Sequence, residues 1–176
     1  SAEQVKALTI DEAEDIYRKS YWGPSGGDVL PAGLDYAAFD FGINSGPVTA
    51  VKKLQDVLGV AADGWIGEAT MRAVHSFPGG VPALIRAYCA RRMQFLRSLK
   101  SKKTGFPVNG RGWTIRVTGK DPLGKLKDQP GVIGNALAMA SLTPMPPMPM
   151  PKPAPDVDVG AKAEPATPNP WMQPEV

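Results

Sequence analysis

The protein has 176 residues, of which 43% are apolar, and a formal net charge of +3 at neutral pH. A chain of this length buries one good core or two small ones, which excludes a second large domain. It contains no uninterrupted apolar run of about 18 residues, and its polar beginning is not a signal-peptide pattern, so we expect no membrane span. One cysteine and one histidine exclude an internal disulfide and a structural zinc site, and we expect neither a metal nor an organic cofactor.

The first predicted helix covers about residues 9–21. Its start, Thr-Ile-Asp-Glu at residues 9–12, is a capping box, in which the first hydroxyl and the last carboxylate each bind a free backbone amide. Ile16 and Tyr17 continue an apolar face. Residues 23–32 open with Gly-Pro-Ser-Gly-Gly, which favours turns, and we expect a loop there.

The next segment, residues 34–43, is apolar nearly all round. Its sequence, Leu-Asp-Tyr-Ala-Ala-Phe-Asp-Phe-Gly-Ile, fits a buried helix or a buried strand, and the two alanines favour a helix. Ser-Gly-Pro at residues 45–47 starts another helix, with the proline in the first turn, where its missing amide costs nothing. Gly59 supplies a left-handed stop. The apolar positions at helical spacing between these ends are Val51, Leu54, Val57 and Leu58.

Two further helices are expected over residues 68–76 and 82–99. Cys89 lies on the apolar face of the second one, and we expect it in the core, because a catalytic thiolate needs an accessible, electropositive setting and usually a histidine partner. Nothing alternates convincingly at period two. The predicted class is therefore all-α, with at most a minor hairpin near residues 114–117.

From residue 143 onward the composition changes, since 11 of the last 34 residues are proline. Proline lacks the amide that helices and sheets need, and we expect an extended, disordered tail.

Four motifs in the helical part carry the functional information, and each is weak alone. They are Tyr21-Trp22; Phe-Asp-Phe-Gly-Ile-Asn-Ser-Gly-Pro at residues 39–47; Leu54-Gln55 with Asp-Gly-Trp-Ile-Gly-Glu-Ala-Thr at residues 63–70; and Gly-Arg-Gly-Trp at residues 110–113. In this order and spacing, over about residues 6–118, they resemble glycoside hydrolase family 108, a lysozyme-like group of phage and prophage muramidases, followed by the peptidoglycan-binding segment usually found with it.

The resemblance implies a lysozyme-like fold and an endolysin-like N-acetylmuramidase that cleaves the glycan strand of the bacterial cell wall without a cofactor. Residues 1–47 would be the end of the hydrolase domain, residues 48–120 the peptidoglycan-binding helices, residues 121–142 a terminal helix or loop, and residues 143–176 the Pro-rich tail. Glycosidic cleavage needs a carboxylic acid that protonates the leaving oxygen.

In that family the pattern begins with a glutamate followed by two glycines. None of the six glutamates of this chain is followed by Gly-Gly. We therefore expect the general acid to lie upstream of Ser1 and the chain to be inactive by itself. Loss of an N-terminal helix would leave apolar surface exposed on residues 34–43.

The resemblance also points to substrate-binding residues. Asp40 and Asn44 share one helical face, and we favour Asp40 as a brace of the cleft over a direct sugar ligand. Phe-Gly-Ile-Asn-Ser-Gly at residues 41–46 also resembles the Phe-Asn-x-Gly segment of other phage endolysins, which lies beside the saccharide cleft, and this similarity points to Asn44 and Ser45 as cleft residues. Alternatively, Asn44 ends one helix and Ser45 caps the next. Tyr21 and Trp22 offer flat faces for a sugar ring, with core packing favoured for Tyr21 and the cleft for Trp22.

Two more motifs supply candidates. Asp-Gly-Trp-Ile-Gly at residues 63–67 resembles the turn of small peptidoglycan-binding modules, where the carboxylate binds the turn amides and both glycines permit unusual backbone angles. We favour this structural role over direct wall contact by Trp65. Arg111, Trp113 and Arg116 fit the Gly-Arg-Gly-Trp segment, which closes one end of the cleft or braces the fold.

Residues 86–127 contain twelve lysines and arginines and one acid. Such a surface attracts anionic cell-wall polymers, and the competing partner, nucleic acid, has no recognisable motif here. We expect peptidoglycan as the partner, no nucleic acid, and a monomer that is made in the cytoplasm and acts on the wall in the periplasm. The alternative function is a non-catalytic wall-binding module that uses Trp22, Trp65, Trp113 and the basic surface.

Overall fold

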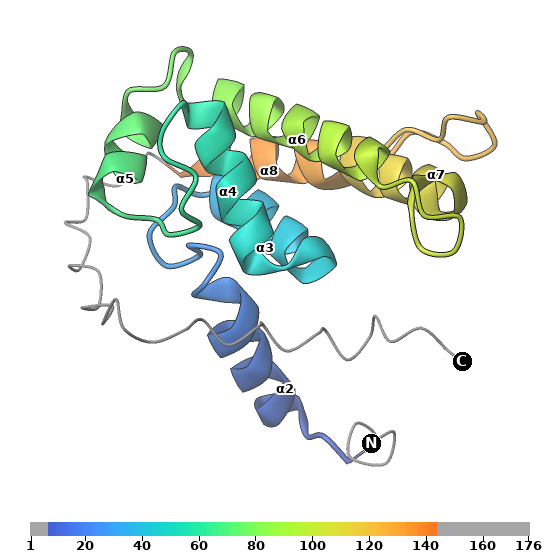
Figure 1. Cartoon of the computed structure of the whole chain (residues 1–176), viewed down its shortest axis with the longest axis horizontal. Coiled ribbons are helices and arrows are strands. Elements are labelled where there is room, and N and C mark those ends of the chain that lie inside the picture. Colours follow the sequence, from blue (N-terminus) through green and yellow to red (C-terminus); the bar gives the residue numbers. More distant parts are fainter. Residues whose placement is uncertain (1–6, 144–176) are drawn as a thin grey trace.

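The structure, a computed structural model, describes residues 7–143, and all regular elements within them are helical (Figure 1). They are α2 (Ile10–Tyr17), the π-helical turn η1 (Arg18–Trp22), α3 (Leu34–Ser45), α4 (Pro47–Leu58), α5 (Glu68–His75), α6 (Gly80–Ser98), α7 (Phe106–Thr118) and α8 (Gly131–Leu142). The predicted all-α class is confirmed. The predicted tail lies, apart from Thr143, outside the described residues.

Most helix ends follow the local chemistry of the sequence. In the capping box of α2, Thr9 N donates to Glu12 Oε2 at 2.9 Å and Glu12 N donates to Thr9 Oγ1 at 3.3 Å. Gly59 adopts the predicted left-handed conformation after α4, with φ 69°. Ser45 departs from the prediction, because it ends α3 and does not cap α4, whose N-cap is Gly46 without a side-chain hydrogen bond.

The hairpin predicted near residues 114–117 is wrong, because these residues lie inside α7. Proline at position 107 occupies the first turn of this helix, and Gly119, with φ 74°, ends it. Val117 is fully buried, and α7 contacts both α6 and α8. Packing of the helix therefore outweighs the strand preference of its β-branched side chains.

Helices α3 and α6 connect the helical body, because each packs against several of the other helices. Helix α3 contacts α4, α6 and α8, and α6 contacts α4, α5, α7 and α8 as well. Leu34, Ala37, Ala38 and Phe41 on α3 are all fully buried. We expected exposed apolar surface on residues 34–43, and this is wrong, because the neighbouring helices cover that segment.

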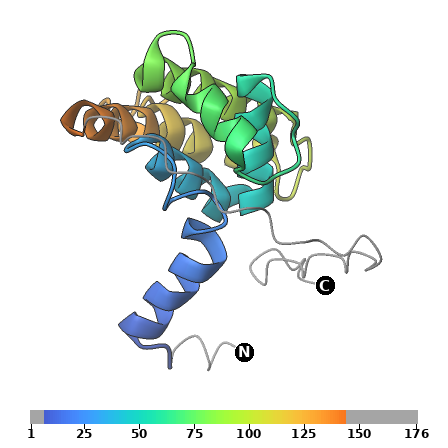
Figure 2. The ribbon, with the colours of Figure 1, turned by 90° about the vertical axis from the view of Figure 1, so that its left-hand side faces the viewer.

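Helix α2 extends away from the body, and none of its residues is buried (Figures 1 and 2). Ile10 is 79% exposed, and Ile16 and Tyr17 are also exposed. The helix contacts η1, which in turn contacts α3. The uncovered apolar surface therefore belongs to α2. No helix among residues 7–143 is both long and apolar enough to cross a bilayer.

Candidate functional site

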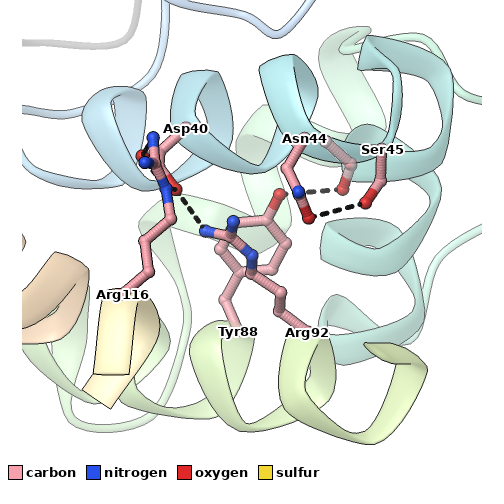
Figure 3. A network of polar contacts seen from close by, with 7 residues as sticks. Asp40, Asn44, Ser45, Tyr88, Arg92 and Arg116 are labelled. Carbon is pink, nitrogen blue, oxygen red and sulfur yellow. Dashed lines mark hydrogen bonds and ion pairs between the residues drawn. The ribbon is translucent and has the colours of Figure 1, made fainter. Parts of the chain in front are cut away.

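An ion cluster around Asp40 connects helices α3, α6 and α7 (Figure 3). Asp40 on α3 accepts a hydrogen bond at 2.6 Å from Arg92 Nη1 on α6. Arg116 on α7 donates to the same carboxylate from Nη2 at 2.6 Å and from Nε at 3.1 Å. With two guanidinium partners, Asp40 has the arrangement of a brace between α3, α6 and α7.

Arg92 is the more deeply buried arginine of this cluster, with 1% of its surface exposed. Its guanidinium carbon lies 5.0 Å from the centre of the Phe41 ring, a cation–π distance. A charge this deep is costly unless it is paired, and Asp40 is the carboxylate that pairs with it. Sequence reasoning treated Arg92 only as part of a basic stretch and missed this role.

A pocket of roughly 250 Å³ opens beside the cluster. Its walls come from Tyr36 and Asp40 on α3, Ile115 and Arg116 on α7, and residues 129–132 with Asn135 at the start of α8. The predicted cleft residues Tyr21, Trp22, Asn44 and Ser45 do not line this pocket.

Asn44 and Ser45 lie at the end of α3, one turn beyond Asp40 (Figure 3). Both side chains are half-buried, and Ser45 Oγ donates to Asn44 Oδ1 at 3.2 Å. Asp40 and Asn44 therefore share a helix face as predicted, but the pocket takes in only Asp40.

Trp22 fixes the loop that follows it. Its indole Nε1 donates to Asp28 Oδ1 at 2.9 Å, and its ring meets the Phe39 ring edge-on with 5.5 Å between centres. The backbone of Gly27 lies directly against the indole, and a side chain at this position would collide with it. Tyr21 is half-buried, 5.9 Å from the Tyr17 ring.

The turn at residues 63–67 is held by a buried amide. Gln55, with 1% of its surface exposed, donates from Nε2 to Asp63 Oδ1 at 2.6 Å and to Trp65 O at 2.8 Å. Its Oε1 accepts from Gly64 N at 2.8 Å. Asp63 Oδ1 also accepts from Trp65 N at 2.8 Å, which confirms the predicted bond to a turn amide.

This clamp has two further consequences. The hydrogen bond from Gln55 lowers the pKa of Asp63 and keeps it charged at neutral pH. Gly64 adopts a left-handed conformation, with φ 87°, whereas Gly67 is extended, with φ −93°, so the prediction that both glycines need unusual angles is wrong for Gly67. The Trp65 side chain projects from the turn, and the residue is 50% exposed.

Arg111 and Trp113 both have partners within the protein. Arg111 binds Asp121 through two hydrogen bonds of 2.9 Å, and the backbone amides of residues 123, 125 and 126 donate to the same carboxylate. The Arg111 guanidinium lowers the pKa of Asp121 far below its usual range. Trp113 is half-buried against the core, 6.4 Å from the Phe106 ring. Arg111 thus stabilises the loop after α7, and Trp113 packs beside Phe106 at the start of that helix.

The basic stretch at residues 86–127 is partly neutralised in the fold. Four of its twelve cations form ion pairs with carboxylates: Arg91, Arg92, Arg111 and Arg116. Exposed lysines remain in the two loops that flank α7: Lys100, Lys102, Lys103, Lys120, Lys125 and Lys127. These loops keep the positive surface that the sequence predicted.

Cys89 lies in the core, as predicted, and burial raises the pKa of its thiol to about 11. The thiol is therefore protonated at neutral pH and unsuited to nucleophilic attack. Among residues 7–143, no group of histidine, cysteine, aspartate or glutamate side chains is arranged to hold a metal ion.

Comparison with known proteins identifies the family. A family model described as "Glycosyl hydrolase 108" matches residues 1–46, and one described as "Predicted Peptidoglycan domain" matches residues 49–118. No curated protein matches the chain. Among solved structures, the chain is similar to SagA of Brucella abortus, with 41% sequence identity and a TM-score of 0.67, over 80% of this chain and 70% of that one.

The two matched segments share a single hydrophobic core, which runs from Leu30 to Ala136. The matches and the all-α fold support a peptidoglycan hydrolase or peptidoglycan-binding function. At this identity and coverage, the chain belongs to glycoside hydrolase family 108 and carries the peptidoglycan-binding segment of that family.

Proposed function

We propose that this chain binds bacterial peptidoglycan through the surface that carries Trp65, and that residues 7–143 supply no general acid for cleavage of the glycan. The observation that carries the proposal is an exposed indole on a turn held by a buried glutamine. This turn lies within the segment that matches the peptidoglycan domain model.

The exposure of Trp65 favours a binding role over a packing role. A tryptophan that stabilises a core is buried, as Trp113 partly is, whereas half of Trp65 faces solvent. The apolar face of a sugar ring packs well on such an indole, while the polar groups of both stay in water. Gln55 and Asp63 fix the backbone on both sides of the indole, so little conformational entropy is lost when a ligand binds.

A general acid must carry a proton near neutral pH and reach the glycosidic oxygen. The pKa values of Asp63 and Asp121 are lowered, so these two groups do not meet the first requirement. Both oxygens of Asp40 are held by arginines, so this carboxylate is not free to reach a glycosidic oxygen. Burial raises the pKa of Asp35, but its Oδ1 accepts the backbone amides of residues 33 and 36 at 2.7 and 2.5 Å in the first turn of α3. Both the amides and the helix dipole favour its charged form.

The test combines retention on insoluble peptidoglycan with a zymogram on cell wall. We expect the purified chain to be retained without clearing the wall, and Trp65→Ala to reduce retention by at least about tenfold. Tyr17→Ala is the matched control, because Tyr17 on α2 is 49% exposed and lies outside the turn. Clearing by the chain would show that a general acid is present. Equal retention of both variants would remove Trp65 from the binding surface.

Nucleic acid is the alternative partner, because the loops flanking α7 are rich in lysine, and a DNA-binding assay beside the retention assay tests it. Salt-sensitive binding to duplex DNA without retention on peptidoglycan would favour this alternative. Cytoplasmic synthesis, action in the periplasm and a monomeric state remain predictions, and size-exclusion chromatography with light scattering tests the last of them.

A further inference from the structure

The loop between α7 and α8, residues 119–130, carries two exposed leucines among lysines. Leu123 is 59% exposed and Leu126 is 49% exposed. Lys120, Lys125 and Lys127 alternate with them along the loop, and all three are exposed. A single exposed leucine is common on protein surfaces, but two on one short loop, each placed between lysines, form an amphipathic surface.

The backbone of this loop is folded around Asp121, whose carboxylate also binds an arginine of α7. The amides of residues 123, 125 and 126 donate to that carboxylate at 3.0–3.1 Å, and the Gly124 amide donates to Asp121 O at 2.9 Å. Residue 122 is a proline and has no amide. Residues 122–126 therefore have no free backbone donor, and the leucines are held in solvent by a fixed backbone.

Three further lysines lie at the same end of the molecule, in the loop before α7. Figure 1 shows both loops at the end of the helical body opposite α5. The lysines of the first loop are Lys100, Lys102 and Lys103, and all are exposed. Arg111 neutralises Asp121, and Asp128 is the one other acid in the two loops. This end of the protein therefore presents a surplus of positive charge around the leucines.

We propose that this end of the protein docks on the surface of an anionic phospholipid bilayer, with Leu123 and Leu126 inserted between the headgroups. Lysines near such a surface attract its negative lipids, and their apolar stems pack on acyl chains while the ammonium groups stay in water. Backbone amides are costly in apolar surroundings when they are free, but those of residues 123–126 are already bonded. The inference goes beyond the proposed function, because it names a second surface and a second partner.

Other kinds of partner fit this loop less well. A nucleic acid or an anionic wall polymer would pair with the lysines, but it would leave the leucines in water. It would also find no free amide at residues 122–126 for a phosphate group. A protein partner would have to cover the lysines, and lysine is depleted at the centre of protein interfaces. Apolar side chains, a satisfied backbone and lysines together favour lipid.

The test is co-sedimentation of the full chain with vesicles that contain phosphatidylglycerol, compared with vesicles of phosphatidylcholine alone. We expect binding to the anionic vesicles to be at least about tenfold tighter and to weaken as salt is added. The double substitution Leu123→Ser, Leu126→Ser should weaken this binding by at least about tenfold. Leu142→Ser is the matched control, because Leu142 on α8 is 82% exposed and lies outside the loop, and it should bind as the wild type does.

A second measurement locates the loop in the bound protein. Leu123→Cys introduces a thiol that takes a polarity-sensitive dye selectively, because Cys89 is only 1% exposed. We expect the dye emission to shift to the blue on anionic vesicles, and the same dye at Leu142→Cys not to shift. Equal binding to both kinds of vesicle, unchanged binding by the double variant, or no blue shift at position 123 in the bound protein would overturn the proposal. Unchanged binding by the double variant together with tight binding to duplex DNA would assign the lysines to a polyanion instead.

Discussion

Two polar networks hold this molecule together, and they differ in what they leave exposed. The Asp40 cluster is charged and joins helices α3, α6 and α7, and its Asp40–Arg92 pair is buried. The Gln55 network centres on a neutral amide, joins α4 to the turn that follows it, and leaves Trp65 in solvent. We infer that the first network mainly maintains the fold, whereas the second mainly presents Trp65, the residue that we propose binds peptidoglycan.

The largest expected effect separates the two networks by stability. Asp40→Asn removes the one carboxylate that pairs with Arg92 within residues 7–143, and breaking a buried pair in this way costs about 3–5 kcal/mol. We expect the free energy of unfolding in urea to fall by that amount. A loss below about 1 kcal/mol, the range of surface pairs, would mean that the Asp40–Arg92 pair is screened as a surface pair is and that the comparison fails.

A smaller expected effect concerns Gln55. Gln55→Leu keeps a similar side-chain volume but leaves Gly64 N and Thr70 Oγ1 without this hydrogen-bond partner. An unsatisfied buried group costs about 1–3 kcal/mol. Because the turn also loses its support, we expect retention on peptidoglycan to fall together with stability. The Asp40→Asn variant, assayed well below its unfolding midpoint, should be retained on peptidoglycan as the wild type is. If both variants lose retention to the same extent, the networks do not have separate roles.

The sequence predicted the second network better than the first, and the reason is distance along the chain. Asp63 binds an amide two residues away, so its turn is visible in a short motif. Arg92 and Arg116 bind Asp40 from 52 and 76 positions away, and no local pattern indicates such a pair. The one available signal for the role of Gln55 was its position beside Leu54 on the apolar face of α4. A buried amide there needs a hydrogen-bond partner, and the turn provides it.

The helices show the same division. Caps and spacing predicted the start of α2 and the end of α4, because the groups involved are neighbours in sequence. The strand preference near residue 115 was misleading, because α6 and α8 determine the conformation of α7. The exposed face of α2 was not foreseen either, since a helix pattern alone does not show which neighbours will cover it.

Because Asp63 acts in its charged state, we expect the support that it gives to the turn at residues 63–67 to depend on pH. Its pKa is lowered in the folded protein, so its contribution is complete above the ordinary aspartate pKa of about 3.9 and is lost as pH falls through the folded value. We expect Trp65-dependent retention to weaken below about pH 4. In Asp63→Asn, which lacks the titrating group, retention should change less over this window. Parallel pH profiles of the two proteins would count against the role of Asp63 in presenting Trp65.

The smallest expected effect comes from a second ion cluster, in which the carboxylate is more exposed than Asp40. Asp56 on α4 also has two cationic partners, Lys53 at 2.9 Å and Arg91 at 2.8 Å, but it lies at the surface. Exposed pairs contribute little, because water and salt screen them, and we expect Asp56→Asn to cost about 1 kcal/mol or less in urea unfolding. This variant is therefore the baseline for Asp40→Asn, since each removes one carboxylate from two cations. A cost equal to that of Asp40→Asn would show that the number of partners, and not burial, sets the strength of both clusters.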